Sequence, residues 1–296
     1  MKTSFWERLW AYAISQNLTN WIPDRVFLKI TFYLKMHKKL NLKNPSTYNE
    51  KLQWLKLYDH NALYTTLVDK AEVKEYVKSI IGEEYVIPSF GVWDRFEQID
   101  FDSLPTQFVL KCTHDSGGLS ICKDKASFDT NEARRKIIKC LKKNFYYSGR
   151  EWVYKNVKPR IIAEQYMENS TTKELEDYKF FVFNGQVKLL FVGTNRFGNG
   201  ETYFDFFDEK FNHLSFTHGH PNAPITPKKP VHFELMKELA TKLAQGLPHV
   251  RVDLYEANNK VYFGEMTFYH HSGFVPFCPE EWDENLGQWL DLPCVE

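Results

Sequence analysis

The sequence lacks several features that would assign it quickly to a class of protein. Its 296 residues carry no net charge, because 38 lysines and arginines balance 38 aspartates and glutamates. A neutral chain gives no overall indication of nucleic acid binding or of an acidic tail. The five cysteines are scattered, odd in number and form no CxxC pair. The sequence therefore indicates neither a disulfide framework nor a zinc site, and it is typical of a reducing cytosol.

Signals for membranes and repeats are also missing from the sequence. No apolar run approaches the ~20 residues that span a bilayer, and no signal-peptide pattern opens the chain. We find no internal repeat and no low-complexity tract. We expect a cytoplasmic protein, at most peripheral at the inner face of the membrane, with enough length for roughly two domains.

The first 65 residues differ from the rest of the chain. Apolar residues recur at helical spacing over 4–18 and 23–39, and Thr47 with Glu50 makes a capping box that opens a third helix. Residues 25–49 contain six lysines and arginines and no acid. We expect a solvated helix face here, with a surface for anionic lipid or polyanionic glycan as the alternative. Nucleic acid is not expected.

The remainder of the chain mixes strand patterns with helical ones. Helical patterns lie at residues 69–81, 131–145, 232–245 and 280–290. Strand patterns lie at residues 84–93, 106–112, 119–124, 160–167, 177–193 and 202–208. The dipeptide Asn184-Gly185 between two apolar runs is a strong hairpin signal. The order of these patterns predicts an α+β fold with antiparallel sheets, not a regular βαβ series.

A second hairpin pattern, at residues 251–268, brings two carboxylates together. Side chains alternate along a strand, so Arg251 and Asp253 share one face of the first strand. Asp253 can lie opposite Glu265 only if the loop holds an odd number of residues, such as the three residues 258–260. Two directly opposed carboxylates repel each other. The pattern therefore predicts a positive charge between them.

A polar turn between two strand patterns is a further candidate site. Lys111 ends the first strand, and residues 113–118 form a short turn that contains glycine. Backbone amides in such a turn can point at phosphate oxygens, which a nearby lysine neutralises. On its own, the pattern is more typical of an ordinary hairpin with a surface lysine.

Taken in order, these motifs resemble the ATP-grasp superfamily, and more closely its TupA-like branch of polysaccharide-biosynthesis proteins. The similarity covers roughly residues 20–292 and rests on NPSTYNEKLQWLKLYD, LVDK, KCTHDSGG, DYKFFVFNG, RVDLY and FGEMTF. The resemblance implies an ATP-grasp fold, in which two α+β lobes with antiparallel sheets grip ATP. After the helical segment that the sequence pattern predicts at 1–65, it implies a first lobe with the phosphate loop at 66–157 and a second lobe with the magnesium and nucleotide site at 158–296. Many ATP-grasp ligases carry a Rossmann-like domain where this chain has the helical segment.

The resemblance also implies roles for individual residues. The implied nucleotide contacts are Lys70, Lys111, His114, Ser116, Gly117, Gly118, Glu164, Gln165, Tyr166, Met167, Asp177 and Lys179. Among these, residues 164–167 would hold adenine through their backbone, and Asp177 would contact ribose. The implied catalytic cations are Arg251, Lys179 and Lys111, with Arg196 as a further candidate. The implied magnesium ligands are Asp253, Glu265 and Thr267, and the last stands where the superfamily usually has asparagine.

The reaction that the resemblance implies is ATP-dependent ligation with two magnesium ions. A carboxylate would be activated as an acyl phosphate, and an amine would then displace phosphate to form an amide. The branch implies a carboxylated glycan, such as a uronic acid unit, as acceptor and an amino acid or peptide as amine donor. The setting would be the biosynthesis of a cell-surface or capsule polysaccharide. A kinase acting on a glycan hydroxyl, and a nucleotide-regulated module that binds glycan or membrane, stay open as alternatives.

Two groups of residues lie outside these motifs. Ser272 and Gly273 belong to a loop that resembles a substrate-facing segment. His270 and His271 are adjacent, so on an extended chain they point apart and do not easily share one metal ion. His218, with His220, lacks a third partner for a metal site. We therefore expect no histidine metal site.

Overall fold

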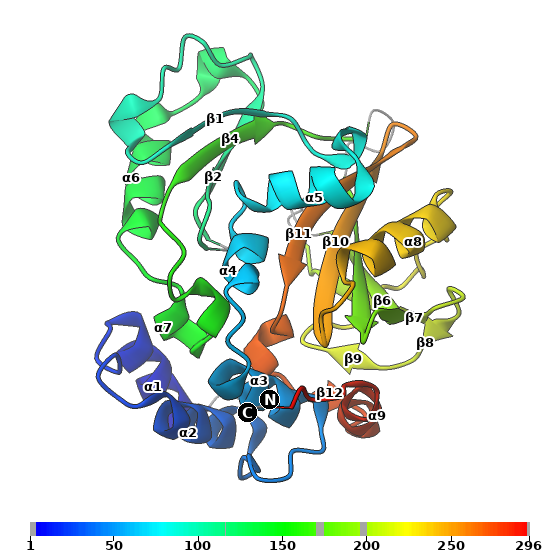
Figure 1. The fold of residues 1–296 in the computed structure, drawn as a ribbon. Helices are drawn as coiled ribbons and strands as arrows, with labels where there is room; N and C mark the ends of the chain where they lie inside the picture. The colour runs from blue at the N-terminus through cyan, green and yellow to red at the C-terminus, as the bar shows by residue number, and fades with distance from the viewer. Residues whose placement is uncertain (1–3, 116, 170–174, 196–199, 295–296) are drawn as a thin grey trace.

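Two antiparallel sheets organise the chain (Figure 1). The computed structural model describes residues 4–115, 117–169, 175–195 and 200–294. A four-stranded sheet of order β1-β4-β2-β3 is built from β1 (Ser89–Trp93), β2 (Phe108–Cys112), β3 (Leu119–Cys122) and β4 (Ile161–Gln165). Its neighbouring strands are all antiparallel. The core between this sheet and α6 (Thr130–Leu141) contains Phe108, Leu110, Ala133 and Ile137.

The larger sheet has six strands in the order β11-β10-β5-β6-β7-β8. These are β5 (Glu176–Phe183), β6 (Gln186–Thr194), β7 (Tyr203–Asp208), β8 (His213–Leu214), β10 (His249–Ala257) and β11 (Lys260–Thr267). A separate short sheet pairs β9 (Thr217–His218) with β12 (Phe277–Cys278). The predicted α+β class with antiparallel sheets is confirmed.

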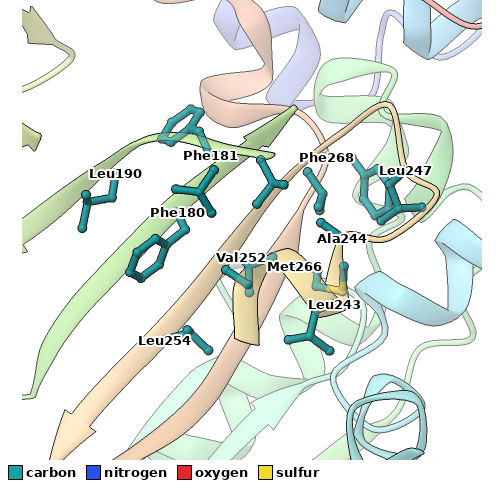
Figure 2. Packing of buried hydrophobic residues seen from close by; sticks show 14 of the residues in the cluster. Phe180, Phe181, Leu190, Leu243, Ala244, Leu247, Val252, Leu254, Met266 and Phe268 are labelled. Atoms are coloured by element: carbon teal, nitrogen blue, oxygen red, sulfur yellow. The ribbon is translucent and has the colours of Figure 1, made fainter. Parts of the chain in front are cut away.

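One face of the six-stranded sheet is apolar and is covered by α8 (Phe233–Leu243). Figure 2 shows Phe180, Val252 and Leu254 in the cluster to which Leu243 also belongs. Register pairs Val252 with Phe180 on one side and with Met266 on the other. Since successive side chains point to opposite faces, the neighbours of these residues lie on the face away from α8.

Four helices lie within described residues 4–68: α1 (Phe5–Ser15), α2 (Asp24–Met36), α3 (Tyr48–Tyr58) and α4 (Leu63–Val68). The predicted capping box at the start of α3 is confirmed, because Thr47 and Glu50 exchange side-chain to backbone hydrogen bonds of 3.3 and 3.4 Å. Among the described residues, α3 packs against α9 (Glu281–Trp289), and α5 (Val73–Ile81) lies between the two large sheets (Figure 1).

The predicted division of the chain at residues 65 and 157 stays a prediction. Strand β4 begins at Ile161 and lies in the four-stranded sheet. Within the part of the chain that the structure describes, none of the helices is both long and apolar enough to cross a membrane.

Strands β10 and β11 form the predicted hairpin, but the predicted three-residue loop is wrong. Ala257 pairs with Lys260, so the turn consists of Asn258 and Asn259 alone. Both asparagines have positive φ, 52° and 62°. A two-residue type I′ turn requires this conformation at both central positions, and asparagine adopts it more readily than most residues.

The odd residue that places the two carboxylates opposite each other is Gly264. Asp253 pairs with Glu265, whereas the next residue, Leu254, pairs with Phe263. Gly264 therefore has no partner on β10 and forms a β-bulge. The bulge, not the loop, sets the register of the carboxylate pair.

Candidate functional site

Asp253 lies at the centre of the polar face of the six-stranded sheet. Register places it between Lys179 on β5 and Glu265 on β11. The carboxylate of Asp253 is fully buried and accepts hydrogen bonds from Arg251, at 2.7 Å from Nε and 2.8 Å from Nη2. Lys179 also forms an ion pair with it. Burial raises the pKa of Asp253, and the charges of Arg251 and Lys179 oppose that rise.

Glu265 differs from its partner because its side chain is 40% exposed. Arg251 Nη2 lies 3.4 Å from Glu265 Oε1, so one guanidinium bridges both carboxylates. Burial acts to raise the pKa of Glu265, but the charges of Lys70, Lys179 and Arg251 outweigh it and lower the pKa to about 2. Glu265 is therefore ionised at neutral pH and has an open side on which a ligand can bind.

Lysines from the four-stranded sheet and from α5 line one pocket together with Glu265. Glu164 on β4 is buried and forms ion pairs with Lys74 at 2.5 Å and with Lys111 at 2.6 Å. Burial opposes ionisation of Glu164, but the charges of Lys111 and Lys74 lower its pKa below the usual value. The pocket between the two sheets is lined by Lys70, Val73, Lys74, Lys111, Glu164, Tyr255, Phe263, Gly264 and Glu265.

The polar turn after β2 is connected to this pocket through Lys70, one of its lining residues. Lys70 Nζ donates to the carbonyl of Asp115 at 2.5 Å, and the N–H of Gly118 donates to Asp115 Oδ1 at 2.9 Å. A Cβ on Gly118 would lie 2.5 Å from the sulfur of Cys112, which explains the glycine. Gly117 is exposed, and Ser116 lies outside the described residues.

His114 belongs to the same turn but is directed elsewhere. Its Nε2 lies 3.2 Å from the carbonyl of Cys140 and 3.0 Å from that of Lys143. The ring therefore donates to carbonyls at the C-terminal end of α6, where such orphan groups need donors. This contact gives His114 a structural role, and its phosphate contact stays a prediction.

Residues 164–167 begin in β4 and continue along the chain toward β5. The N–H of Gln165 donates to the carbonyl of Pro88 at 2.9 Å, and the hydroxyl of Tyr166 donates to Glu168 at 3.2 Å. Met167 is half-buried. Asp177, at the start of β5, forms an ion pair with Lys179 at 2.6 Å. Contacts to adenine and ribose stay predictions.

Arg251 has two further partners that fix its orientation. Nη2 donates to Thr267 Oγ1 at 2.9 Å, and Nη1 donates to Nδ1 of His270 at 2.7 Å. Because Nδ1 accepts this bond, the proton of neutral His270 lies on Nε2. Burial lowers the pKa of His270 well below its usual value, and the charge of Arg251 adds to the effect.

Three histidines meet behind Arg251, which the sequence did not predict. His218, His270 and His271 each bring a ring nitrogen within 4.8 Å of the other two. The expectation that His270 and His271 point apart is wrong, because His271 adopts φ 47° in the turn after β11. A metal-bound histidine normally donates its second N–H to an acceptor. Since His270 instead receives a bond from Arg251, the cluster fits a neutral histidine group better than a metal centre.

The loop that contains Ser272 and Gly273 is held by α3. Lys56 is buried, and its Nζ donates to the carbonyl and the hydroxyl of Ser272 at 2.7 and 2.9 Å and to the carbonyl of Gly149 at 2.9 Å. Burial lowers the pKa of Lys56 to about 7. Gln53 donates to the carbonyl of Gly273 at 2.9 Å. The N-terminal helices therefore help to position His270, and through it Arg251.

Sequence reasoning missed Lys56, Lys74 and His270 as parts of this arrangement. A signal for Lys74 was present, because it follows Lys70 by four residues, which is about one helical turn. No sequence signal connects His270 with the arginine, because their contact depends on the turn after β11. The other candidate, Arg196, lies outside the described residues.

The chain is similar to several proteins of known structure at low sequence identity. No curated protein matches the chain. Among solved structures, D-alanine–D-alanine ligase from Bacillus anthracis complexed with ATP is 15% identical with a TM-score of 0.40, over 69% of this chain and 54% of that chain. The same ligase from Helicobacter pylori is 15% identical with a TM-score of 0.41, over 83% and 70%. The ATP-grasp ligase PsnB, complexed with minimal precursor, Mg and ADP, is 9% identical with a TM-score of 0.39, over 86% and 65%.

The chain spans about half the length of the Bacillus anthracis ligase. A family profile described as TupA-like ATP-grasp matches residues 50–291, which is most of the chain. The match includes both large sheets and the facing carboxylates. The chain belongs to the TupA-like ATP-grasp family.

Proposed function

We propose that this protein is an ATP-dependent carboxylate–amine ligase. The proposal rests on one observation: lysines and an ionised glutamate line the same pocket from opposite sides. Lys70, Lys74 and Lys111 come from the first lobe, and ionised Glu265 faces them from β11. Phosphoryl transfer depends mainly on positioning and on electrostatic stabilisation, which such an arrangement supplies.

The lysine groups fit a polyphosphate. Lys74 and Lys111 are held side by side by the single carboxylate of Glu164, so two cations are fixed with only one counter-charge. Lys70 donates to a backbone carbonyl, so this hydrogen bond brings no counter-charge to it. We assign Lys70, Lys111 and the turn at Gly117 and Gly118 to the phosphates, with Ser116 and Arg196 as further candidates.

The acidic residues fit magnesium, which prefers carboxylate oxygens and retains water. Glu265 is ionised and partly exposed, so its carboxylate oxygens are accessible to a magnesium ion. Asp253 is bonded to Arg251 and Lys179, and it joins a metal site only if it gives up part of those bonds. Thr267 is the third candidate ligand. Magnesium bound here would neutralise phosphate charge, and we propose two ions.

Arg251 and Lys179 are the proposed catalytic cations. Each is buried against a carboxylate on the polar face of the sheet, so the protein holds them rigidly before any substrate binds. Preorganised charge of this kind stabilises a developing negative charge without reorganisation. Arg251 and Lys179 would stabilise charge on the transferred phosphoryl group, and exclusion of water would protect the acyl phosphate.

For the substrates, we propose a carboxylated glycan such as a uronic acid unit as acceptor and an amino acid or peptide as amine donor. Membership of the TupA-like family supports an acceptor from polysaccharide biosynthesis. We propose that the enzyme works in the cytoplasm, peripherally at the inner face of the membrane, where its N-terminal basic helices make contact. A kinase acting on a glycan hydroxyl is the alternative.

Hydroxylamine trapping separates the ligase from the kinase. The protein is incubated with ATP, magnesium and a panel of uronic acids, and hydroxylamine is then added. An acyl phosphate gives a hydroxamate together with ADP and free phosphate, whereas a kinase leaves a stable phosphorylated product and no hydroxamate. The variant Glu265→Gln is the matched control, because it should lose the hydroxamate while keeping the fold. A stable phosphate ester formed one-to-one with ADP would overturn the ligase proposal.

A further inference from the structure

The N-terminal helices expose much apolar surface. Sixteen large apolar side chains are exposed among the described residues, and nine of them lie between residues 5 and 33. These nine are Phe5, Trp6, Leu9, Tyr12, Leu18, Trp21, Val26, Ile30 and Tyr33. We call these nine residues together the N-terminal apolar face. Five of the nine are aromatic, and Trp21, in the loop between α1 and α2, is 82% exposed.

The residues of the apolar face are different from those that pack the N-terminal helices together. On α2, Val26, Ile30 and Tyr33 follow helical spacing on the exposed side. The opposite side of the same helix contributes Phe27 to a buried cluster of its own. Helix α1 already packs there through Trp10, whose ring lies 5.6 Å from that of Phe27. The exposed residues are therefore not needed to join α1 to α2.

The exposed charge around this face is positive. Among described residues 4–49 the acids are Glu7, which is buried, and Asp24, which pairs with Arg150 at 3.2 Å. Seven cations lie in the same range: Arg8, Arg25, Lys29, Lys35, Lys38, Lys39 and Lys43. One of them, Lys38, forms an ion pair with Glu280. One acid of this segment is therefore buried and the other, although 40% exposed, is paired with Arg150, whereas the seven cations are exposed.

A basic hollow lies beside the apolar face. It is lined by Arg25, Lys29, Leu40, Asn41, Leu42, Lys43 and Tyr58, and it has a volume of about 570 Å³. No carboxylate is among these lining residues. The wall formed by the loop after α2 is fixed by Glu50, which accepts the N–H groups of Asn41 and Ser46 at 3.0 Å each. Arg25 is oriented by a hydrogen bond to the hydroxyl of Tyr58.

From these observations we infer that the N-terminal apolar face docks on an anionic membrane, with Arg25, Lys29 and Lys43 binding the phosphate of a lipid headgroup. Tryptophan and tyrosine favour the region between headgroups and hydrocarbon, and cations beside them attract anionic lipid. A second copy of the chain would bring the same uncompensated positive charge against this face, so self-association is opposed. The inference deepens the proposed membrane contact and does not depend on ATP chemistry.

Vesicle binding by the full chain tests the inference. Sedimentation is measured with phosphatidylglycerol-containing vesicles and with pure phosphatidylcholine vesicles, at low and at high salt. We expect preference for the anionic vesicles, weakened by salt, and a loss of about tenfold or more in Trp6→Ala/Trp21→Ala. The matched control is Ile225→Ala/Val231→Ala, whose side chains are 85% and 86% exposed elsewhere and whose loss should leave binding unchanged.

The headgroup site has its own matched pair of variants. Arg25→Gln/Lys29→Gln/Lys43→Gln removes one arginine and two lysines from the hollow. The control removes the same residue types from the exposed surface of α6, namely Arg135, Lys136 and Lys139. We expect about tenfold weaker binding in the first triple variant and little change in the second. Equal losses in both would overturn the headgroup site.

Light scattering and the comparison of vesicle types separate membrane docking from self-association and from nonspecific adsorption. A dimer that dissociates in Trp6→Ala/Trp21→Ala would assign the face to a second copy of the chain and overturn the membrane inference. Equal binding to both vesicle types at low salt would also overturn it. ATP turnover in solution should be unchanged in all these variants, so failure of the ligase proposal is detected separately from failure of the membrane inference.

Discussion

Replacing Asp253 with asparagine should destabilise the protein as well as remove ATP turnover. From the sequence alone, this change would relieve repulsion between two facing carboxylates and leave the fold intact. The structure gives the opposite expectation, because the buried carboxylate of Asp253 has Arg251 and Lys179 as direct partners. Neutralising it leaves two buried cations with less counter-charge.

The magnitude follows from the burial of the group. Removing one partner of a buried ion pair costs about 3–5 kcal/mol, and asparagine keeps one acceptor oxygen, so we expect about 3 kcal/mol for Asp253→Asn. At about 2–4 °C per kcal/mol for a chain of this size class, the melting temperature should fall by roughly 6–12 °C. Glu265→Gln is the control, because its side chain is 40% exposed and partly exposed pairs contribute below about 1 kcal/mol.

The assay is thermal and urea unfolding of both variants at pH 7 with EDTA, so that bound magnesium adds nothing to stability. ADP release in the presence of magnesium is measured in parallel. Both variants should lose turnover, but only Asp253→Asn should lose much stability. If Asp253→Asn melts at the wild-type temperature, or if Glu265→Gln is the less stable of the two, the assignment of the buried charge to Asp253 is wrong.

Three further changes test other parts of the structure. Burial lowers the pKa of His249 to about 3, so below about pH 6.5 the unfolded chain binds a proton at this residue and the folded chain does not. The free energy of unfolding should therefore fall by about 1.4 kcal/mol for each pH unit below about 6.5. Urea unfolding of His249→Gln should not show this slope. Gly264→Ala places a Cβ 2.8 Å from the ring of Tyr255, so it should cost about 1–3 kcal/mol by overpacking and reduce turnover through a shifted bulge; unchanged turnover would contradict the role of the bulge. Lys56→Met removes a donor from the carbonyl of Gly149 and one from the carbonyl of Ser272, which keeps Gln53, and it should speed amide exchange in residues 270–274 with normal exchange in β5.

The sequence was sufficient where local chemistry decides the structure. The capping box of Thr47 and Glu50 and the hairpin at residues 251–268 are set by neighbouring residues, and both are present, although the hairpin loop is one residue shorter than predicted. The opposition of Asp253 to another carboxylate was predicted from alternation along two strands. The predicted position of the extra residue was wrong. Parity constrains the total number of residues between the two carboxylates, and it does not say whether the extra residue lies in the loop or in a bulge.

The sequence was insufficient where partners come from distant segments. Glu164 was expected to contribute its backbone, yet its side chain joins lysines from α5 and β2, which no local pattern connects. His270 and His271 were expected to diverge because the chain was assumed to be extended there. The positive φ of His271 reverses that geometry, and a non-glycine residue in this region is uncommon enough that sequence alone rarely predicts it.

The charge balance of the site bears on how many magnesium ions accompany the nucleotide. Five cations face four carboxylates on the two walls, so the protein alone contributes a small positive charge. ATP adds about four negative charges at neutral pH, which one divalent ion halves and two divalent ions cancel. Added to the protein's net charge of about +1, one ion leaves the occupied site at about −1 and two ions leave it at about +1, so the charge balance requires at least one ion and fits either number. The residues that enter the count are Lys70, Lys74, Lys111, Lys179 and Arg251 with Glu164, Asp177, Asp253 and Glu265.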